Sequence, residues 1–191
     1  MCNHRSAKGG CMSLTNLLSS QIKDTYVATD ALIALVDDGQ LSWKPSQGGN
    51  WWTLGQLLRH ITVSCGIWCK GFVTGEWEDS GEVDMSAVPE GAALPPAEAY
   101  RSIESVAAAR AALEKDRAIA LEMIEKAGEE ALATKNAVAP WNPTPRTLGL
   151  RLLDMIRHLE SHKAQLFFYL KLMGEPVHTG HLWGVGNVVE E

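Results

Sequence analysis

The sequence lacks the features that mark a membrane protein or a disulfide-rich secreted domain. No apolar run approaches the ~18 residues that a membrane-spanning helix needs, and the first residues lack the apolar stretch of a secretory signal. Only four cysteines occur in 191 residues, and Cys65 and Cys69 have a CxxxC spacing rather than the CxxC of redox and zinc motifs. We therefore expect reduced thiols, a cytoplasmic protein and no membrane partner.

Positive charge is also scarce. The 17 lysines and arginines are outnumbered by 23 acidic residues, so the formal net charge is -6 and a nucleic acid would meet a surface of like charge. Hydrophobic residues make up 46% of the chain, enough for a single domain with a sizeable core. We expect residues 1–12 to form a flexible leader, 13–178 the domain and 179–191 a C-terminal tail.

The alternation that predicts β-strands is absent, and helical periodicity accounts for most of the chain. Apolar residues recur at helical spacing in four segments, over about 14–37, 53–75, 96–128 and 147–173. Thr53 is suited to cap the second segment, Pro96 to open the third and Gly174 to end the fourth. The sequence therefore predicts an all-α fold, an antiparallel four-helix bundle. Its two long connections, before the third and the fourth segment, are expected to cross over the bundle or to cover a site.

The fourth segment carries histidines where a helix core would carry apolar side chains. Its stripe recurs in steps of four and three and consists of Leu148, Leu152, Met155, Leu159, His162, Leu166, Tyr169 and Met173. His162 occupies a core position of this stripe, and His158 lies one turn earlier, about 40° around the axis. His60 flanks the stripe of the second segment in a similar way. If the two helices are neighbours, three imidazoles converge inside the bundle and can bind a divalent transition metal.

Another interpretation of these histidines stays open. A single histidine on an apolar face is usually a hydrogen-bonded core residue, and pairs at this spacing also occur on ordinary surfaces. Three buried imidazoles without a metal would leave several ring nitrogens in need of partners, at about 1–3 kcal/mol for each one unmet. We therefore favour a metal site, and the alternative is a metal-free bundle whose histidines hydrogen-bond to one another.

Two stretches of the sequence resemble the DinB-like (YfiT-like) superfamily of metal-binding four-helix bundles. The first, WWTLGQLLRHI, places a tryptophan shortly before a helix whose middle carries His60. The second, TLGLRLLDMIRHLESHKAQLFFYLKLMGEPV, carries His158, His162 and Gln165 in the order of the family's final helix. Lysine and alanine follow His162 where arginine and glycine are commoner. The similarity follows four helices in order over most of residues 12–178.

The resemblance implies a site, a chemistry and an assembly. It implies that His60, His158 and His162 hold a divalent metal, often zinc or nickel, and that the chain forms a homodimer. Characterised relatives include S-transferases that join a low-molecular-weight thiol, such as bacillithiol or mycothiol, to an electrophile, and a mycothiol-dependent maleylpyruvate isomerase. Many members have no known activity, and the family's damage-inducible name does not imply DNA binding.

Helical spacing suggests further site candidates. Asp154 and Gln165 lie near the stripe edge that carries the histidines, and either can orient an imidazole. Arg110 and Arg117 share the apolar face of the third segment and would bind the carboxylates of a thiol cofactor, unless they are basic side chains that extend from the stripe to solvent. Trp141, in the connection before the fourth segment, is a candidate lid over a substrate pocket.

The expected chemistry follows from the charge of the site. A metal with three neutral imidazoles keeps its full positive charge and favours an anion such as hydroxide or thiolate. A thiol bound there is deprotonated near neutral pH and attacks small electrophiles. The same site could activate water, and the residues alone do not separate the two reactions. With the family resemblance, we expect an S-transferase that uses a thiol of the bacillithiol, mycothiol or glutathione type. A metal-dependent hydrolase and a non-catalytic metal- or ligand-binding stress-response protein are the alternatives.

Overall fold

The computed structural model describes residues 12–185, most of which lie in α-helices. The helices are α1 (Leu14–Ile33), α2 (Leu54–Ile61), α3 (Gly66–Thr74), α4 (Val106–Thr134) and α5 (Leu148–Met173). Two strands, β1 (Asn136–Ala139) and β2 (Asn142–Thr147), pair antiparallel. Short 3-10 turns are η1 (Asp38–Gln40), η2 (Met85–Ala87), η3 (Ala97–Ala99) and η4 (Thr179–Trp183). The leader expected over residues 1–12 lies outside the described residues except for Met12.

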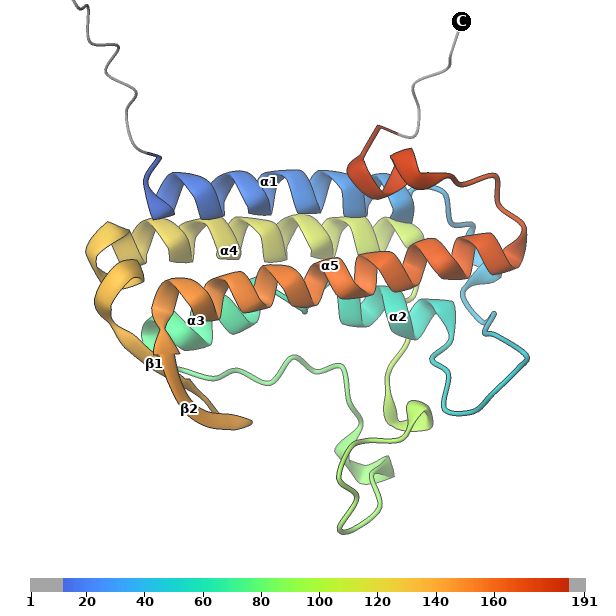
Figure 1. Cartoon of the computed structure of the whole chain (residues 1–191). Coiled ribbons are helices and arrows are strands. Elements are labelled where there is room, and N and C mark those ends of the chain that lie inside the picture. Colours follow the sequence, from blue (N-terminus) through green and yellow to red (C-terminus); the bar gives the residue numbers. More distant parts are fainter. Residues whose placement is uncertain (1–11, 186–191) are drawn as a thin grey trace, which may run out of the picture.

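The helices pack as four rods, and α2 and α3 together form one of them (Figure 1). The end of α4 lies beside the start of α1, because the Glu129 carboxylate accepts a hydrogen bond from the backbone N–H of Leu14. The start of α4 lies beside the start of α2, where the N–H of Ile103 donates to the carbonyl of Gly55. The rod of α2 and α3 is therefore parallel to α4, so a strictly antiparallel bundle was not the right prediction. The connection over residues 75–105 returns along the bundle (Figure 1).

The structure corrects the prediction of one continuous helix over residues 53–75. That helix is interrupted between α2 and α3, where Asp116 of α4 places its carboxylate. The carboxylate accepts hydrogen bonds from the N–H of Gly66 (2.9 Å) and Ile67 (3.0 Å), and so caps α3. It also accepts one from the Tyr26 hydroxyl at 2.6 Å. A Cβ on Gly66 would lie 2.0 Å from the Asp116 carbonyl oxygen, so this close approach requires glycine.

The predicted bounds of the third helix were wrong at both ends. α4 begins at Val106, because the Ser105 side chain caps it there, and the residues after Pro96 form η3 instead. At Gly128, the predicted end, the backbone takes a φ of 70°, but helical structure resumes and continues to Thr134. The left-handed conformation of this glycine kinks the helix without ending it.

A β-hairpin stands where no β structure was predicted. Its second strand contains two prolines and is largely exposed, so no apolar alternation marks it in the sequence. Arg151 of α5 is 4% exposed and donates to the backbone carbonyls of Ala137, Asn142 and Thr144. Tertiary contacts with α5 therefore hold this hairpin, which replaces the crossover expected before the fourth segment.

The core fills the space between the rods with large apolar side chains. Among those that are fully buried are Ile22, Leu32, Leu54, Leu57, Leu58, Ile61, Ile124, Leu132 and Leu148. After α5, the turn η4 packs against α1 and α5, and the Lys163 ammonium donates to the carbonyl of Leu182 at 3.0 Å.

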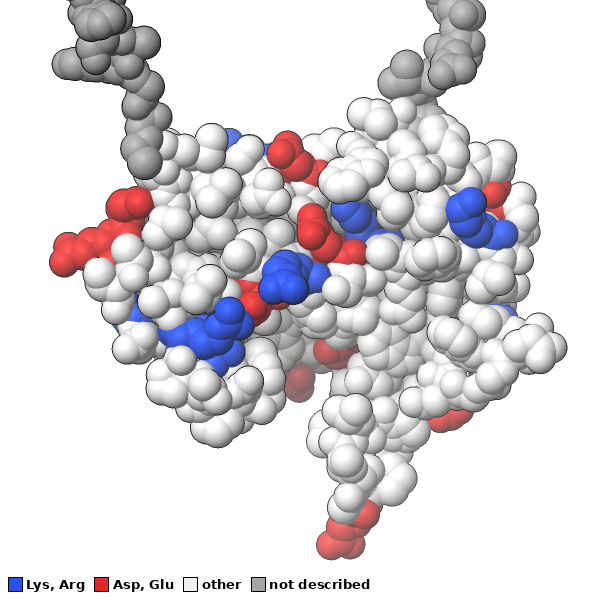
Figure 2. All heavy atoms as spheres, in the orientation of Figure 1, with Lys and Arg blue, Asp and Glu red and all other residues white. Residues whose placement is uncertain are grey.

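Within residues 12–185, no helix has the length and apolar character that crossing a membrane requires. On the face in Figure 2, basic side chains occur in small separate groups beside acidic ones.

Candidate metal centre

Three histidine side chains from two distant segments converge inside the bundle. His60 lies near the end of α2, and His158 and His162 lie one turn apart on α5. Their Nε2 atoms form a triangle with sides of 3.0, 3.1 and 3.3 Å. Two nitrogen ligands at ~2.0–2.1 Å from a tetrahedral zinc are about 3.3 Å apart. The triangle therefore has the size that a single divalent cation requires, and this histidine group could hold one.

The second nitrogen of each imidazole contacts a hydrogen-bond acceptor. The contacts are His60 Nδ1 to Glu82 Oε2 at 2.6 Å, His158 Nδ1 to the Ser64 carbonyl at 3.0 Å, and His162 Nδ1 to Gln165 Oε1 at 3.0 Å. Since all three partners are acceptors, each Nδ1 carries the proton and each Nε2 presents a lone pair to the same point. Three lone pairs with no donor between them fit a cation, and they disfavour the metal-free alternative in which the imidazoles hydrogen-bond to one another.

The three acceptors come from different local structures. Glu82 lies in the connection between α3 and α4, is 7% exposed, and accepts at its own carbonyl from the N–H of Arg101. Ser64 lies in the interruption between α2 and α3, so its carbonyl is outside the helical hydrogen-bond ladder and accepts from His158. Gln165 lies on α5 itself. The interruption of the second rod is therefore part of the site.

Burial keeps two of the imidazoles unprotonated. Burial, followed by the charge of the neighbouring His60, lowers the pKa of His162 from 6.5 to about 4. The same two causes, in the same order, lower the pKa of His158. Both rings are therefore neutral near pH 7, which is the form that binds a metal ion.

One side of the triad opens into a pocket of about 370 Å³. We call it the triad pocket, and the residues that line it are Gly49, Asn50, Trp51, Trp52, Leu94, Pro95, Tyr100, His162 and Gln165. The Trp52 ring lies 4.7 Å from that of His60 and 5.7 Å from that of His162, between centroids. Tyr100 packs on Trp52 at 4.7 Å, and burial together with the charge of Glu82 raises its pKa, so its hydroxyl stays protonated. Aromatic rings thus form the wall beside the three histidines.

A model of the DinB superfamily matches residues 21–166, a stretch that includes all three histidines. The chain belongs to the DinB superfamily. Its structure is similar to the crystal structure of a DinB-like protein from Bacillus cereus ATCC 10987, with a TM-score of 0.63 and 17% sequence identity over 87% of this chain and 97% of that chain. At that identity the likeness shows the mostly helical DinB-like fold alone. No protein of curated function matches the chain.

Two residues expected to support the site of this DinB protein lie elsewhere. The Asp154 carboxylate contacts Arg146 of β2 at 2.6 Å rather than an imidazole. Trp141 is 56% exposed and packs against Trp68 and Trp77, with centroids 5.4 and 5.8 Å apart. The observed contacts give no support to Asp154 as an orienting group or to Trp141 as a lid, because each side chain is engaged at the hairpin.

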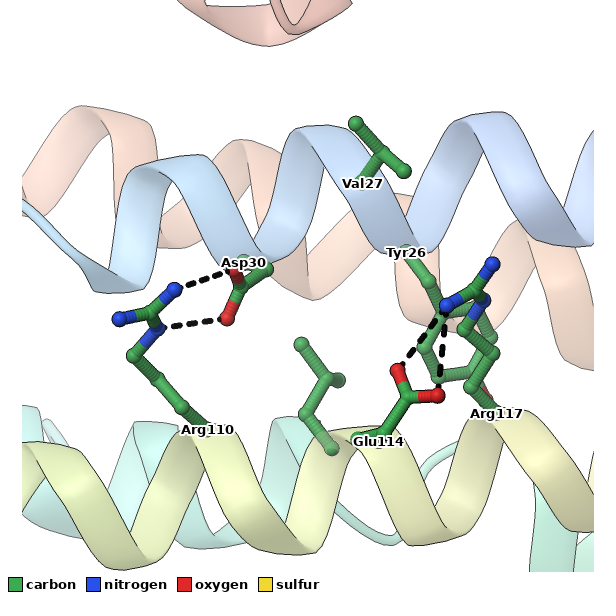
Figure 3. Close-up of a pocket in the computed structure, with 7 residues that line it drawn as sticks. Tyr26, Val27, Asp30, Arg110, Glu114 and Arg117 are labelled. Atoms are coloured by element: carbon green, nitrogen blue, oxygen red, sulfur yellow. Dashed lines mark hydrogen bonds and ion pairs between the residues drawn. The ribbon is translucent and has the colours of Figure 1, made fainter.

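Arg110 and Arg117 line a different pocket, between α1 and α4 (Figure 3). This pocket has a volume of about 300 Å³ and shares no lining residue with the triad pocket. Arg110 contacts both carboxylate oxygens of Asp30, at 2.8 and 2.7 Å, and Arg117 contacts Glu114 at 3.0 Å. Each guanidinium already has a carboxylate partner. The structure therefore does not place them where they would clamp a thiol cofactor at the triad.

Sequence reasoning missed Glu82, the Ser64 carbonyl and the pocket wall of Trp52 and Tyr100. Nothing in the sequence distinguishes Glu82 from the other acids of the stretch EWEDSGEVD. The only signal was the expectation that this long connection covers a site. Of the two orienting residues that were predicted, Gln165 is the one in contact with a ligand, His162.

Proposed function

We propose that this DinB protein binds a divalent metal ion and transfers a low-molecular-weight thiol to a small electrophile. The observation that carries the proposal is the triangle of histidine Nε2 atoms, whose Nδ1 atoms are all held by acceptors. Three neutral imidazoles fit zinc or nickel and do not themselves neutralise the charge of the ion. When bound, such an ion supplies the Lewis acidity that lowers the pKa of a thiol at the open side of the triad.

The triad pocket lacks a carboxylate that could act as a general base. Zinc hydrolases of the HExxH type use a glutamate as general base, but the residues that line this pocket include no aspartate or glutamate. Glu82 is engaged at the Nδ1 of His60, on the ring edge away from the Nε2 triangle. A thiol beside a cation ionises near neutral pH without such a base. A hydrolase that uses a carboxylate general base therefore has less support.

The chain's own residues bind and orient the reactants in this proposal. During the reaction the thiol sulfur forms a bond to a carbon of the electrophile, the leaving group departs with the bonding electrons, and the thiol proton passes to solvent. Trp52 and Tyr100 limit the access of water to one side of the triad. Gln165 fixes the ring of His162, which faces the pocket.

Metal content and thiol transfer can be measured on one preparation. Protein purified without a histidine tag is stripped with a chelator, reloaded with zinc or nickel, and assayed for conjugation of a small electrophile with several thiols. We expect one ion per chain and a rate that depends on it. His162→Ala removes one of three ligands and should lose most of the metal and the activity. His178→Ala, on the exposed turn η4, is the matched control and should keep both.

The outcomes distinguish the alternatives. Equal rates for the parent and His162→Ala would remove the enzymatic proposal for those substrates. Bound metal without turnover of any thiol would instead favour a non-catalytic metal- or ligand-binding protein. Absence of bound metal would favour the metal-free bundle. The homodimer stays a prediction, which a mass measurement in solution tests.

A further inference from the structure

The triad pocket contains no cationic side chain. Its wall combines the aromatic and apolar side chains of Trp51, Trp52, Leu94, Pro95 and Tyr100 with the His162 imidazole and the amides of Asn50 and Gln165. One of these amides is already engaged, because the Asn50 side-chain oxygen accepts from the backbone N–H of Ala97 at 3.0 Å. Among the described residues that line the pocket, none can form an ion pair with a carboxylate or a phosphate of a bound ligand.

None of the lysines and arginines among the described residues lines the triad pocket. The Arg59 guanidinium donates to the carbonyl of Ser80 at 2.9 Å and does not line the pocket. Arg101 is exposed and does not line the pocket. Arg110 and Arg117 line the pocket between α1 and α4, where acids neutralise them (Figure 3). A ligand at the triad therefore meets one source of positive charge, which is the metal ion.

The balance of charge limits the ligand to a single anionic group. A divalent ion at the triad lies next to the ring whose Nδ1 contacts Glu82, so one negative charge is already present behind it. A thiolate on the open side adds the second. A further carboxylate on the ligand would lie beside aromatic rings with no cationic side chain to pair with, and the partial loss of its hydration there would be unfavourable.

An apolar groove continues from the triad pocket over the outer face of α5. The groove has a volume of about 390 Å³ and shares Trp51 and Gln165 with the pocket. Its other walls include Phe168 and Leu172, which are 59% and 65% exposed. A ligand body longer than the pocket would thus extend over apolar side chains rather than into a charged surface. Pocket and groove together fit the range of small-molecule sites, about 300–1,000 Å³.

We infer that the triad pocket selects a ligand in which the thiol is the one ionisable group. The rest of this ligand is an uncharged aromatic or alkyl body. The inference rests on the proposed function, because a metal ion must hold the sulfur. This selection would distinguish the protein from an enzyme that uses a carboxylate-bearing thiol such as glutathione. Each methylene that the groove covers should strengthen binding about fourfold.

Matched thiols test the selection on metal-loaded protein. The triad is loaded with cobalt(II), whose visible absorption reports both occupancy of the site and binding of a thiolate. The protein is then titrated with phenylmethanethiol and with 4-(mercaptomethyl)benzoate, which adds one carboxylate to the same ring, and with glutathione. We expect phenylmethanethiol to bind at least ~10-fold more tightly than either of the other two. Absence of cobalt absorption would contradict the proposed function, whereas cobalt absorption with equal or tighter binding of a carboxylate-bearing thiol would overturn this inference alone.

A positive charge introduced into the wall of the triad pocket tests whether the lack of cationic side chains causes the selection. Leu94 is 80% exposed and lines the triad pocket, so Leu94→Lys should fold and place an ammonium beside the ligand. We expect this variant to bind 4-(mercaptomethyl)benzoate about tenfold more tightly than the parent does, with little change for phenylmethanethiol. Leu150→Lys, at a position 43% exposed that lines neither the pocket nor the groove, is the matched control. An unchanged preference in Leu94→Lys would show that charge does not set the selection.

Discussion

At the scale of single residues, the orientation of His60 depends on Glu82. The carboxylate lies 2.6 Å from Nδ1, and the side chains of His60 and Glu82 are only 11% and 10% exposed. Glu82→Gln keeps the shape of the side chain and removes its charge. Because the carboxylate strengthens the imidazole as a ligand, we expect metal affinity to fall about 10- to 100-fold, measured by competition with a chromophoric chelator.

The same connection offers a control for this substitution. Glu78 contacts Lys70 at the surface, and its side chain is 53% exposed. Glu78→Gln should therefore leave metal affinity unchanged. If Glu82→Gln bound metal as tightly as the parent and Glu78→Gln, the contact with His60 would have no part in metal binding.

The three histidines could be predicted from the sequence, but most of the residues that orient them could not. Spacing along α5 is a local property, so His158 and His162 are visible as interruptions of an apolar stripe. Gln165 is only three residues after His162, so its position near the site could also be predicted from helical spacing. Glu82 reaches the site only because the connection over residues 75–105 folds back along the bundle, and no local pattern encodes that path.

At the scale of elements, the interruption between α2 and α3 links helix packing to the metal site. A methyl group on Gly66 would clash with the backbone carbonyl of Asp116, so Gly66→Ala should force α3 and α4 apart. We expect the free energy of unfolding of the metal-free protein to fall by about 2–4 kcal/mol, measured by urea denaturation, since overpacking and a weakened cap act together. Metal affinity should fall as well, because the Ser64 carbonyl that holds His158 lies in the interruption.

Gly49→Ala is the matched substitution for comparison. A Cβ there meets nothing within 4 Å, and the backbone of Gly49 lacks a positive φ. This variant should stay within about 0.5 kcal/mol of the parent. A Gly66→Ala variant as stable as Gly49→Ala would show that α4 does not need the close approach seen at Asp116.

Periodicity predicted α1 and α5 well because each presents an apolar face along its whole length. It failed where distant residues decide the structure. The second helix is divided by Asp116, 50 residues away in sequence from Gly66. The hairpin is held by Arg151, and Ser105 rather than Pro96 starts α4. Hydrophobic patterning therefore yields the helical architecture, whereas the breaks that shape the site arise from polar side chains acting across the bundle.

At the scale of the whole molecule, a metal ion at the triad would join α2 to α5. Anything that binds only the folded state stabilises it by an amount set by the ratio of ligand concentration to Kd. We expect metal at a hundredfold excess over Kd to raise the free energy of unfolding by about 2.7 kcal/mol at pH 7.5. Thermal denaturation of parent and His162→Ala, with and without zinc, measures this, and equal shifts in the two proteins would contradict binding at the triad.

The stability of the metal-free protein should depend on pH through His162. Its pKa is about 4 in the folded state, against 6.5 for an exposed ring. Between these values the unfolded chain binds more protons than the folded one, so lowering the pH from 6.5 toward 4 decreases stability. The lowered pKa of His158 acts in the same direction. Since each tenfold change in proton affinity corresponds to about 1.4 kcal/mol, the contribution of His162 approaches ~3 kcal/mol at pH 4.

Urea denaturation of the metal-free parent and of His162→Ala, at several pH values between 7.5 and 4.5, isolates this contribution. We expect the parent to lose stability more steeply than the variant below pH 6.5, because the variant lacks the ring that must stay unprotonated. A difference in free energy of unfolding that stays constant over this range would mean that His162 titrates alike in both states. The burial that lowers its pKa would then not hold in solution, and the ring nitrogens proposed to bind the metal would be protonated under mildly acidic conditions.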